Sequence, residues 1–467
     1  MSTGIFLDDD EKNAETKRLK AYLDDKLNKA RVAARELESY SQEQVDALVK
    51  ACGKAVFDNA VELAEFAVKD TGMGVVEDKI AKNRVKANMI WWSLRDKKSV
   101  GIIERDEKTG IIKVAKPVGV VAAITPVTNP TVTPMSNSMF SLKGRNPIIL
   151  SPHPSAVSTG VKTVEYINAE LKKLGAPDNC IQILDIASME LTQMLIRSAD
   201  VVIATGGMAM VRAVYSSGKP ALGVGAGNVQ ALIDEGVDYD AATKKIITGR
   251  AFDNGIICTG EQSVIAPRKD YDVIMHCFEK NGAFVVPDSQ RDALRSALFP
   301  GGAMNKSLVG QSAATIAAAA GFSVPKATLT LVVEAAGRDD ILGAEKIFPV
   351  LSSYRYDTWG EAIEIARCNL DKTGKGHSIC VHSDNTARIE EAALKTEVSR
   401  IVVNQVCATS GGGSFYNGLN PTNTLGCGSW GNNSISENLT YYHLINVSRI
   451  AYNMMNNRVP SDEEVWA

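Results

Sequence analysis

The sequence lacks any apolar run long enough to cross a membrane, and its charges nearly cancel. No uninterrupted stretch of about 18 apolar residues occurs. The 51 basic and 54 acidic residues leave a formal net charge of -3, so nothing favours nucleic acid or an anionic membrane as a partner. Residues 1–10 lack the basic start and the apolar core of a secretion signal. We therefore expect a cytoplasmic protein with neither a membrane nor a nucleic-acid partner.

Cysteine is also sparse. The eight cysteines among 467 residues include no C-x-x-C pair, so neither a zinc ribbon nor a dithiol redox motif is indicated, and we expect no metal site. Reduced thiols in the cytoplasm are the simplest interpretation. The 45% hydrophobic and 22% charged residues are ordinary for a globular protein, and the length allows about three domains.

The order of the apolar patterns predicts an α/β protein. Residues 11–99 are alanine-rich and charged, with apolar residues at helical spacing, which predicts long helices. From residue 111, strand-like apolar runs alternate with amphipathic helical stretches, as in parallel sheets covered on both faces. A second such pattern runs from about 234 to 430. Within it, residues 410–433 are rich in Gly, Asn, Ser and Thr, which predicts loops of the kind that often carry function.

Cys258 is the most informative single residue. Ile256 and Ile257 precede it, and the small residues Thr259 and Gly260 follow. Small neighbours leave a sulfur atom approachable and leave backbone N–H groups free near a developing oxyanion. A free cysteine is more often a small buried apolar residue. The local sequence therefore leaves catalysis and packing both open.

Four longer segments resemble the aldehyde dehydrogenase superfamily, and within it the CoA-acylating branch. They are residues 124–154, 199–207, 253–266 and 421–450. The similarity is greatest to succinate-semialdehyde dehydrogenases of the CoA-acylating type. The resemblance implies the aldehyde dehydrogenase fold, with a Rossmann-like nucleotide-binding domain and an α/β catalytic domain. It also implies Cys258 as the nucleophile that forms a thioester, NAD or NADP as the cofactor, and coenzyme A as the co-substrate.

The segment LGVGAGN, residues 222–228, departs from the hydrolytic members of the superfamily. Those enzymes carry a Glu-Leu-Gly-Gly-Lys type segment whose glutamate activates water. Gly223 matches that glutamate, beside the cofactor, and a glycine cannot act as a base. The thioester would then survive until a thiol, a strong nucleophile, takes the acyl group. A tightly packed turn is the plainer interpretation, and the spacing does not fit the G-x-G-x-x-G fingerprint.

The same resemblance implies a set of cofactor-binding residues. A serine and a histidine would contact the adenosine ribose, and a Thr-Gly-Gly turn would lie where a helix start approaches the pyrophosphate, a favourable place for anions. A glutamate would hold the nicotinamide ribose. From the residues alone, a proline-stiffened loop, an ordinary strand-to-helix turn and a surface charge are the alternatives. The set is Ser151, His153, Thr205, Gly206, Gly207, Gly223 and Glu345.

Asn129 is the candidate oxyanion donor. Its side-chain amide could stabilise a tetrahedral alkoxide beside the backbone N–H of Cys258. The family asparagine lies two residues before a proline, and that position here is Thr128. A turn-forming Asn-Pro pair at Asn129 is therefore the alternative.

Three further polar residues are candidates for contacts to the substrates. His377, between a glycine loop and a strand, could polarise the CoA thiol or could simply be hydrogen-bonded in place. Arg145 and Arg400 could pair with an anionic substrate tail.

The resemblance divides the chain into three parts. A nucleotide-binding domain takes residues 1–103 and 118–235, and a catalytic domain takes 236–432. Residues 104–117 and 433–467 would form oligomerisation segments. An isolated apolar strand leaves open edges, so we expect the strand near 104–117 to pair with a partner subunit in a homodimer or homotetramer.

We therefore expect an oxidoreductase that interconverts an aldehyde, CoA and NAD(P)+ with an acyl-CoA and NAD(P)H, with succinate semialdehyde as the leading substrate. Three alternatives stay open. They are the same chemistry on sulfoacetaldehyde or another short aldehyde, a hydrolytic enzyme with a relocated base, and a non-catalytic structural or binding homologue. Gly223 argues against the hydrolytic enzyme, and the intact Cys258 segment argues against the non-catalytic homologue.

Overall fold

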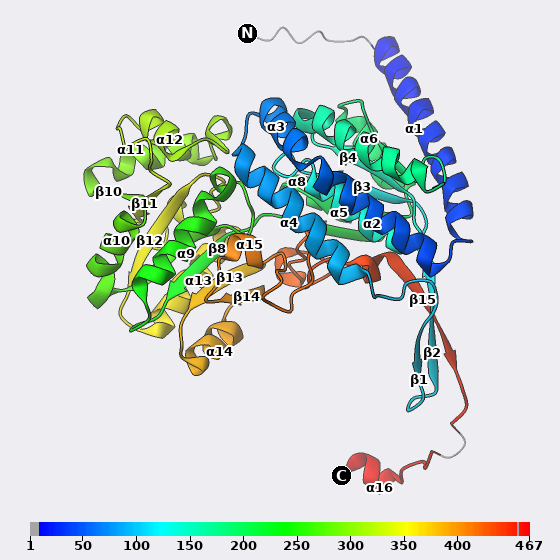
Figure 1. Ribbon diagram of the computed structural model, residues 1–467. Coiled ribbons are helices and arrows are strands. Elements are labelled where there is room, and N and C mark those ends of the chain that lie inside the picture. The colour runs from blue at the N-terminus through cyan, green and yellow to red at the C-terminus, as the bar shows by residue number, and fades with distance from the viewer. Residues whose placement is uncertain (1–8, 455–456) are drawn as a thin grey trace.

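The computed structural model describes residues 9–454 and 457–467 of the chain. Residues 1–8, most of the segment expected not to be a secretion signal, lie outside the described part. Two α/β lobes lie side by side, and a narrow three-stranded sheet projects from one of them (Figure 1). Among the described residues, no helix is both long and apolar enough to cross a membrane.

Four helices form the first hundred residues, as their spacing predicts. Ser41 caps the start of the second helix with a capping box. The Ser41 hydroxyl accepts from the backbone N–H of Gln44, and the Gln44 side chain accepts from the backbone N–H of Ser41. Gly72 ends the third helix with a φ of 69°, a left-handed conformation that glycine adopts without strain. The helices are α1 Asp9–Leu37, α2 Gln42–Asp58, α3 Ala60–Thr71 and α4 Val76–Leu94.

The first lobe contains a five-stranded parallel sheet in the order β5-β4-β3-β6-β7. The chain enters at the central strand β3, winds outward to β5 and then returns to the other side of β3, which makes β3 and β6 neighbours at the switch point. In such sheets ligands bind beyond the carboxyl ends of the strands at this point. The strands are β3 Val121–Thr125, β4 Ile148–Pro152, β5 Ile181–Ile183, β6 Val201–Thr205 and β7 Ala221–Val224.

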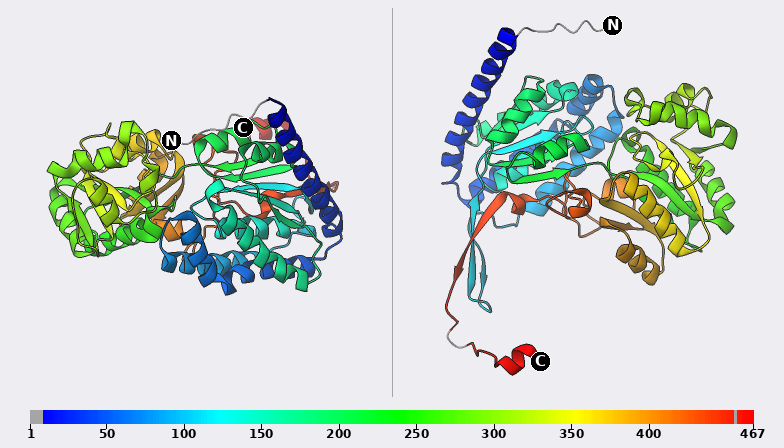
Figure 2. Two further views of the ribbon diagram at one scale, coloured as in Figure 1. Left: turned by 90° about the horizontal axis from the view of Figure 1, so that it is seen from above. Right: turned by 180° about the vertical axis from the view of Figure 1, so that it is seen from behind.

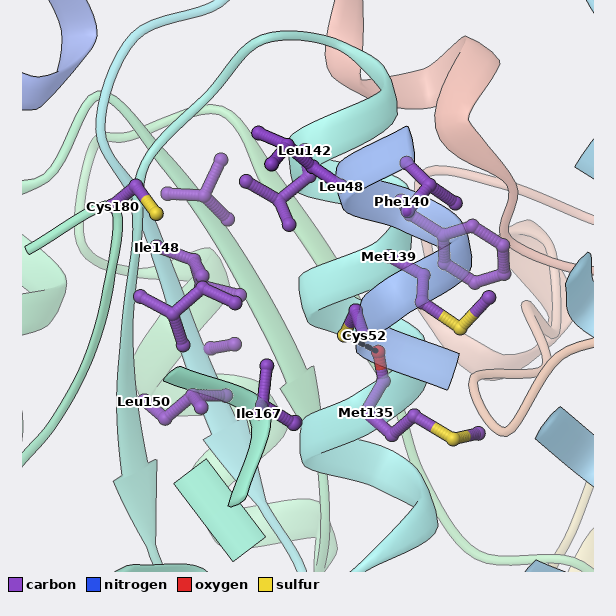
Figure 3. Packing of buried hydrophobic residues seen from close by; sticks show 14 of the residues in the cluster. Leu48, Cys52, Met135, Met139, Phe140, Leu142, Ile148, Leu150, Ile167 and Cys180 are labelled. Atoms are coloured by element: carbon purple, nitrogen blue, oxygen red, sulfur yellow. Dashed lines mark hydrogen bonds between the residues drawn. The ribbon is translucent and has the colours of Figure 1, made fainter. Parts of the chain in front are cut away.

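Helices cover both faces of this sheet, so its strands are apolar throughout, as in other parallel sheets. One face packs against α2, α5 and α6 in a buried cluster that includes Cys52, Met139, Ile148, Leu150 and Ile167 (Figure 3). The other face packs against α1 and α7. The connecting helices are α5 Val132–Lys143, α6 Val157–Lys173, α7 Met189–Ser198 and α8 Met208–Tyr215.

The second lobe contains a seven-stranded parallel sheet in the order β10-β11-β12-β9-β8-β13-β14. Its strand β8 pairs with β9 and β13 and is fully buried. The boundary between the two sheets therefore lies before Val229, and the boundary expected at residue 235 is corrected to this point. The strands are β8 Val229–Ile233, β9 Glu261–Pro267, β10 Ala283–Val286, β11 Thr330–Glu334, β12 Val350–Tyr356, β13 Gly376–His382 and β14 Val398–Val403.

Helices cover the second sheet as well. They are α9 Tyr239–Ala251, α10 Tyr271–Lys280, α11 Asp288–Leu298, α12 Ala313–Ala319, α13 Trp359–Lys372, α14 Thr386–Lys395 and α15 Cys407–Ser410. Short 3-10 turns are η1 Pro154–Ala156, η2 Phe252–Gly255, η3 Arg268–Asp270, η4 Pro300–Gly302, η5 Lys306–Leu308, η6 Ile341–Gly343, η7 Ser429–Gly431 and η8 Tyr441–Leu444.

The projecting sheet is antiparallel, with β2 Ile111–Pro117 between β1 Gly101–Asp106 and β15 Ile445–Ala451. It extends away from both lobes, and helix α16 Asp462–Trp466 follows it (Figure 2). The segment expected to begin at residue 433 leaves the body only near β15, because Leu439 and Leu444 are buried in the core of the first lobe. Where one strand is expected near residues 104–117, the structure has a hairpin formed by β1 and β2.

Candidate active site

Cys258 lies between η2 and β9, where the two lobes and the glycine-rich C-terminal loops meet. It is half-buried and lines a cavity of about 240 Å³. Helix α4 forms one wall, and the loops after β14 form the opposite wall, so the predicted loop segment reaches this site. The lining residues are Ala81, Lys82, Val85, Lys86, Met89, Asn129, Phe252, Ile257, Cys258, Thr259, Ala408, Thr409, Gly412, Thr422, Asn423 and Leu425.

The backbone before Cys258 is strained and firmly held. Asp253, Asn254 and Gly255 have φ values of 53°, 52° and 75°, a left-handed run that costs about 1 kcal/mol or more for each non-glycine residue. Arg250 donates to the Gly255 carbonyl, and an added Cβ at Gly255 would overlap the carbonyl oxygen of Phe348, so only glycine fits there. These contacts fix the direction from which Cys258 enters the cavity.

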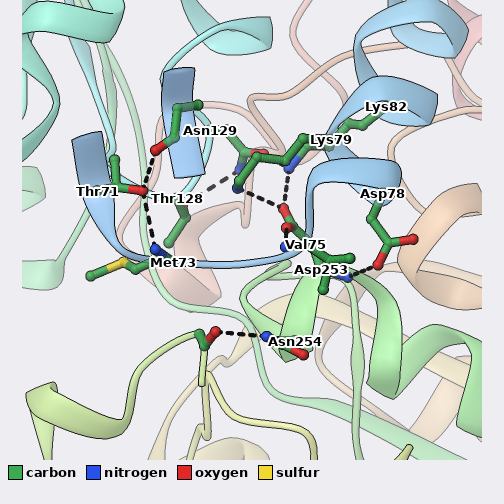
Figure 4. Close-up of polar contacts among 12 residues, drawn as sticks. Thr71, Met73, Val75, Asp78, Lys79, Lys82, Thr128, Asn129, Asp253 and Asn254 are labelled. Carbon is green, nitrogen blue, oxygen red and sulfur yellow. Dashed lines mark hydrogen bonds and ion pairs between the residues drawn. The ribbon is translucent and has the colours of Figure 1, made fainter. Parts of the chain in front are cut away.

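A buried ion cluster of Asp253, Lys79 and Lys82 joins this loop to helix α4 (Figure 4). The Asp253 carboxylate accepts from Lys79 Nζ at 3.0 Å and from Lys82 Nζ at 2.7 Å, and it also accepts from the Val75 N–H at 2.9 Å. Burial alone would raise the pKa of Asp253, but the two ammonium groups outweigh it and lower this pKa below its ordinary value. The carboxylate therefore stays ionised.

Asn129 reaches the same cavity as Cys258, although it is displaced by one residue from the family position. Its Oδ1 accepts from Lys82 Nζ at 2.7 Å, and its Nδ2 has one long contact, 3.5 Å, to Thr128 Oγ1. Thr128, at the family position, is not among the lining residues. The structure thus places an amide near Cys258, and that amide belongs to Asn129.

The surroundings of Cys258 disfavour its thiolate. Burial, followed by the charge of Glu345, raises the pKa of Cys258 to about 11, and Arg400 acts in the opposite direction. Burial raises the pKa of Glu345 itself to about 7. Glu345 Oε1 accepts from the Gly227 N–H at 3.1 Å, and an added Cβ at Gly227 would overlap the carbonyl oxygen of Cys258. The Glu345 carboxylate is therefore hydrogen-bonded to the loop at Gly227, and this loop packs against Cys258.

Gly223 lies on β7 beneath helix α8 and faces that helix. An added Cβ there would lie 3.0 Å from the Tyr215 ring and 3.3 Å from Val211. The Tyr215 hydroxyl also donates to the Gly223 carbonyl at 2.9 Å. A glutamate at this position would require the side chains of Tyr215 and Val211 to shift. Among the described residues, no aspartate or glutamate lines the Cys258 cavity.

Most of the residues expected at the cofactor lie at the carboxyl ends of β4 and β6, on either side of β3. Glu345 lies apart from them, before β12 in the second lobe, and Gly223 lies on β7. Gly207 is the N-cap of helix α8, and an added Cβ at Gly206 or Gly207 would meet nothing within 4 Å. An anion can therefore approach this helix start closely. Thr205 Oγ1 shares a hydrogen bond of 2.9 Å with Thr424 Oγ1, which ties the turn to the C-terminal loop.

Ser151 and His153 lie at the end of β4 but differ in access. Ser151 is buried, and its hydroxyl shares a hydrogen bond of 2.8 Å with Thr192. His153 is exposed, and its Nδ1 accepts from the Ser155 N–H at 3.2 Å. The open turn, the helix start and the exposed ring together fit a nucleotide with a diphosphate group.

His377 is buried on β13 and lines neither the Cys258 cavity nor a smaller hollow of about 180 Å³ near Gly225 and Cys427. Its Nδ1 lies 3.0 Å from Ser378 Oγ, and its Nε2 has no partner within the described chain. Burial, followed by Arg400, lowers the pKa of His377 well below its ordinary value, so the ring is neutral. A direct contact to a CoA thiol would need a path to this ring.

Neither arginine expected to bind a substrate tail lines the cavity. Arg145 donates to the carbonyl oxygens of Glu38 and Ala115 in the first lobe. Arg400 donates to the His377 carbonyl at 2.7 Å and to the Gly426 carbonyl at 2.8 Å, behind the site. Their guanidinium groups are engaged with backbone carbonyl oxygens, and their pairing with a substrate tail stays a prediction.

Lys86 is the cation that the sequence interpretation missed. It lines the cavity from α4, and its Nζ donates to the carbonyl oxygens of Gly412 at 2.9 Å and Thr422 at 3.4 Å. Among the described residues it forms no ion pair, unlike Lys82, whose charge is balanced by Asp253. Burial lowers the pKa of Lys86 to about 8. The only available signal was its helical spacing, four residues after Lys82.

Known proteins resemble this chain along most of its length. Residues 12–294 match the aldehyde dehydrogenase family. The chain is 55% identical over 443 residues to a succinate-semialdehyde dehydrogenase (acetylating) of Clostridium kluyveri, covering 94% of this chain and 98% of that protein. It is 40% identical over 449 residues to a sulfoacetaldehyde dehydrogenase of an Acholeplasma species, covering 94% and 92%.

The fold agrees with a solved structure as well. The crystal structure of an acetylating aldehyde dehydrogenase from Geobacillus thermoglucosidasius superposes with a TM-score of 0.92 at 34% identity, covering 96% of this chain and 99% of that one. This agreement confirms the fold class expected from the sequence. The chain belongs to the aldehyde dehydrogenase family.

Proposed function

We propose that this protein is a CoA-acylating aldehyde dehydrogenase that interconverts succinate semialdehyde, CoA and NAD(P)+ with succinyl-CoA and NAD(P)H. The observation that carries the proposal is the lining of the Cys258 cavity. It combines a thiol, the amide of Asn129 and the unpaired ammonium of Lys86, and among the described residues no carboxylate lines it. The relatives named as acetylating enzymes support the same acceptor.

Acylation begins when the Cys258 thiolate adds to the aldehyde carbon. A carbon–sulfur bond forms, and the carbonyl electron pair moves to oxygen, where the Asn129 amide and the Cys258 N–H stabilise the alkoxide. A nicotinamide dinucleotide, when bound, supplies the acceptor for the hydride that leaves this carbon. The alkoxide electron pair re-forms the carbonyl, and Cys258 is left as a thioester.

Deacylation requires a second nucleophile. Water attack without a positioned base is slower by about 10²–10⁴-fold, and the cavity lining offers no carboxylate for that purpose. The thiolate of CoA attacks the thioester carbon instead, and the bond to Cys258 breaks as acyl-CoA forms. Cys258 leaves as a thiolate, ready for the next cycle.

For the cofactor, we propose that the first lobe is the nucleotide-binding domain. The open turn of Gly206 and Gly207, followed by helix α8, would hold the pyrophosphate. Ser151 and His153 would lie toward the adenosine ribose, and Glu345 would hold the nicotinamide ribose. A positively charged nicotinamide near Cys258 would lower the pKa of the thiol, which counteracts Glu345.

For the substrate, Lys86 favours an aldehyde with an anionic tail. Its charge has no counter-ion in the described chain, while Val85, Met89 and Ile257 offer apolar surface for methylene groups in the same cavity. A carboxylate would supply the missing charge through a charge-assisted hydrogen bond. Sulfoacetaldehyde could use the same lysine, but the relative that acts on succinate semialdehyde is more similar, at 55% against 40% identity.

For the assembly, we propose a cytoplasmic homodimer or homotetramer. Strands β1 and β15 are the two edges of the projecting sheet, and both leave backbone groups unpaired. Partner strands of another copy would cover them. All eight cysteines are free thiols, as expected in a reducing compartment. Light scattering at micromolar concentration should show an oligomer, and a monomer would contradict this assembly.

The function is tested by product analysis with and without CoA. Purified protein is given NAD+ or NADP+ and succinate semialdehyde, sulfoacetaldehyde or butanal. We expect one acyl-CoA per reduced cofactor, with the highest kcat/KM for succinate semialdehyde. Steady formation of free acid without CoA, at a rate close to the CoA-dependent one, would overturn the proposal. A higher kcat/KM for sulfoacetaldehyde would identify that aldehyde, and not succinate semialdehyde, as the preferred substrate.

A further inference from the structure

The Lys82 ammonium group lies between a carboxylate and a side-chain amide. Its Nζ donates to Asp253 Oδ2 at 2.7 Å and to Asn129 Oδ1 at 2.7 Å, and its side chain is only 8% exposed (Figure 4). One contact is an ion pair within the buried cluster. The other reaches the side-chain amide that shares the cavity with Cys258.

The contact to Asn129 has a definite polarity. An ammonium group has only donors, so the amide atom that it contacts must be the oxygen. The Nδ2 group then points away from Lys82, and its one hydrogen bond within the described chain, to Thr128 Oγ1, is long at 3.5 Å. This N–H group remains available to an acceptor in the cavity. With the amide turned over, the oxygen would face the alkoxide and repel it.

We infer that Lys82 is a positioning residue, which fixes the Asn129 amide with its N–H donor toward the alkoxide formed on the carbon bound to Cys258. The inference rests on the proposed function, because it takes Asn129 as an oxyanion donor. Preorganised donors of this kind stabilise charge as it develops, since they need not reorient during the reaction.

Asp253 makes this arrangement rigid. Its carboxylate is fully buried and is also held by the Val75 N–H, while its backbone N–H donates to Asp78 at 2.7 Å. Asp253 lies on the same strained loop as Cys258. Lys82 therefore links the loop that carries Cys258 with the side-chain amide of Asn129, which stabilises the negative charge of the alkoxide.

Lys79 provides a matched control. It donates to the same oxygen, Asp253 Oδ2, at 3.0 Å and is equally buried, yet it makes no contact with Asn129. Lys79→Met and Lys82→Met each remove one ion pair to Asp253 and one buried ammonium. They differ in the contact to the amide and in that Lys82 also lines the cavity, and the double variant with Asn129→Ala separates these two effects.

The test compares kcat, KM and thermal unfolding for Lys82→Met, Lys79→Met, Asn129→Ala and the double variant Lys82→Met/Asn129→Ala. We expect the two lysine variants to lose similar stability, but Lys82→Met to have a kcat lower by about tenfold or more, with little change in KM. Removing one oxyanion donor typically costs about 10²–10³-fold, so Asn129→Ala should lose more. The double variant should be no slower than Asn129→Ala, because Lys82 acts through that residue.

Three results would overturn the inference: equal kcat for the two lysine variants, unchanged kcat in Asn129→Ala, or independent, multiplicative losses in the double variant. If Lys82→Met does not fold, the pair Lys82→Gln and Lys79→Gln replaces it, with the same expected order. CoA-independent turnover of the wild type would overturn the proposed acceptor instead. The comparison of variants would still test Lys82, because the alkoxide forms before the acceptor acts.

Discussion

The loop before Cys258 is tightly held, whereas the turn at Gly206 and Gly207 is open. Asp253 and Gly255 both have left-handed backbone conformations. Asp253 is also ion-paired with Lys79 and Lys82, and Gly255 is packed so closely that no side chain fits there. An added Cβ at Gly206 or Gly207 meets nothing within 4 Å. The backbone that delivers the nucleophile is thus held in one geometry, which favours a near-attack arrangement. The turn expected to bind the cofactor leaves room for a group that must enter and leave.

The same contrast exists within helix α4. Lys82 has its charge balanced by Asp253, while Lys86, one turn later, donates only to carbonyl oxygens. A balanced buried charge serves the structure of the site. An unbalanced one in a ligand cavity favours an anionic ligand.

The largest effect is expected at the nucleophile. Cys258→Ser should lower acyl-CoA formation by at least about a thousandfold, because a serine hydroxyl is far less ionised than a thiol. The fold and cofactor binding should persist. Cys368→Ser, on α13 and outside the cavity, is the control. Retention of more than a few per cent of activity in Cys258→Ser would remove Cys258 from its role.

The second effect sharpens the contrast between the two lysines. Lys86→Met should lower kcat/KM for succinate semialdehyde by about 10- to 100-fold, the equivalent of one hydrogen bond between charged groups. For butanal, which has the same length and no charge, kcat/KM should change little. Arg84→Met removes a charge from an exposed position of the same helix and serves as the control. Equal losses for both aldehydes would show that Lys86 only supports the loops.

The third effect separates the open turn from the tight loop. Gly207→Val should raise the KM for NAD(P)+ by about tenfold without loss of stability, because the new side chain has space but blocks the approach of a phosphate. Gly255→Ala should instead lower the free energy of unfolding by about 2–4 kcal/mol, through overlap and a left-handed backbone. Cofactor titration and denaturant unfolding measure both. Normal cofactor affinity in Gly207→Val would place the pyrophosphate elsewhere.

The smallest effect concerns the charge beside the nucleophile. Glu345→Gln removes a carboxylate that raises the pKa of Cys258, so the thiol should be alkylated by iodoacetamide about two to five times faster at pH 8. Because the pKa of Glu345 is about 7, the variant and the wild type should converge below that pH. Glu397→Gln, at a half-buried glutamate that pairs with Lys375 and does not line the cavity, is the control. A slower reaction in Glu345→Gln would show that this carboxylate acts as a base.

Periodicity and resemblance are sufficient to predict the fold, and the structure places Cys258 in a cavity while its role as nucleophile stays a prediction. The helices before residue 100 and the two parallel sheets follow from local apolar patterns, and the Cys258 segment carries its own signature. The sheet boundary was placed too late because β8 has the same apolar character as the strands of either sheet. Residues 433–444 were assigned to the projecting segment because nothing local shows that Leu439 and Leu444 are buried.

The ion cluster and the tail-binding lysine could not be predicted, because they depend on distant partners. Lys82 and Asp253 are 171 residues apart, and Lys86 meets the carbonyl of Gly412 over a separation of 326. The charges of Arg145 and Arg400 suggest a role in binding an anionic tail, but their buried guanidinium groups are engaged with carbonyl oxygens. Asn129 illustrates the opposite case, since the loop geometry brings it into the cavity despite its displaced position in the sequence.

The central claim is that Cys258 carries the acyl group until CoA removes it. Intact mass spectrometry of the protein, after mixing with oxidised cofactor and succinate semialdehyde but no CoA, tests this claim directly. We predict a mass increase of one succinyl group per chain, located on Cys258, with one equivalent of reduced cofactor and little further turnover. Adding CoA should remove the adduct and yield succinyl-CoA. Continued turnover to free succinate without CoA, or an adduct that CoA does not remove, would contradict the account.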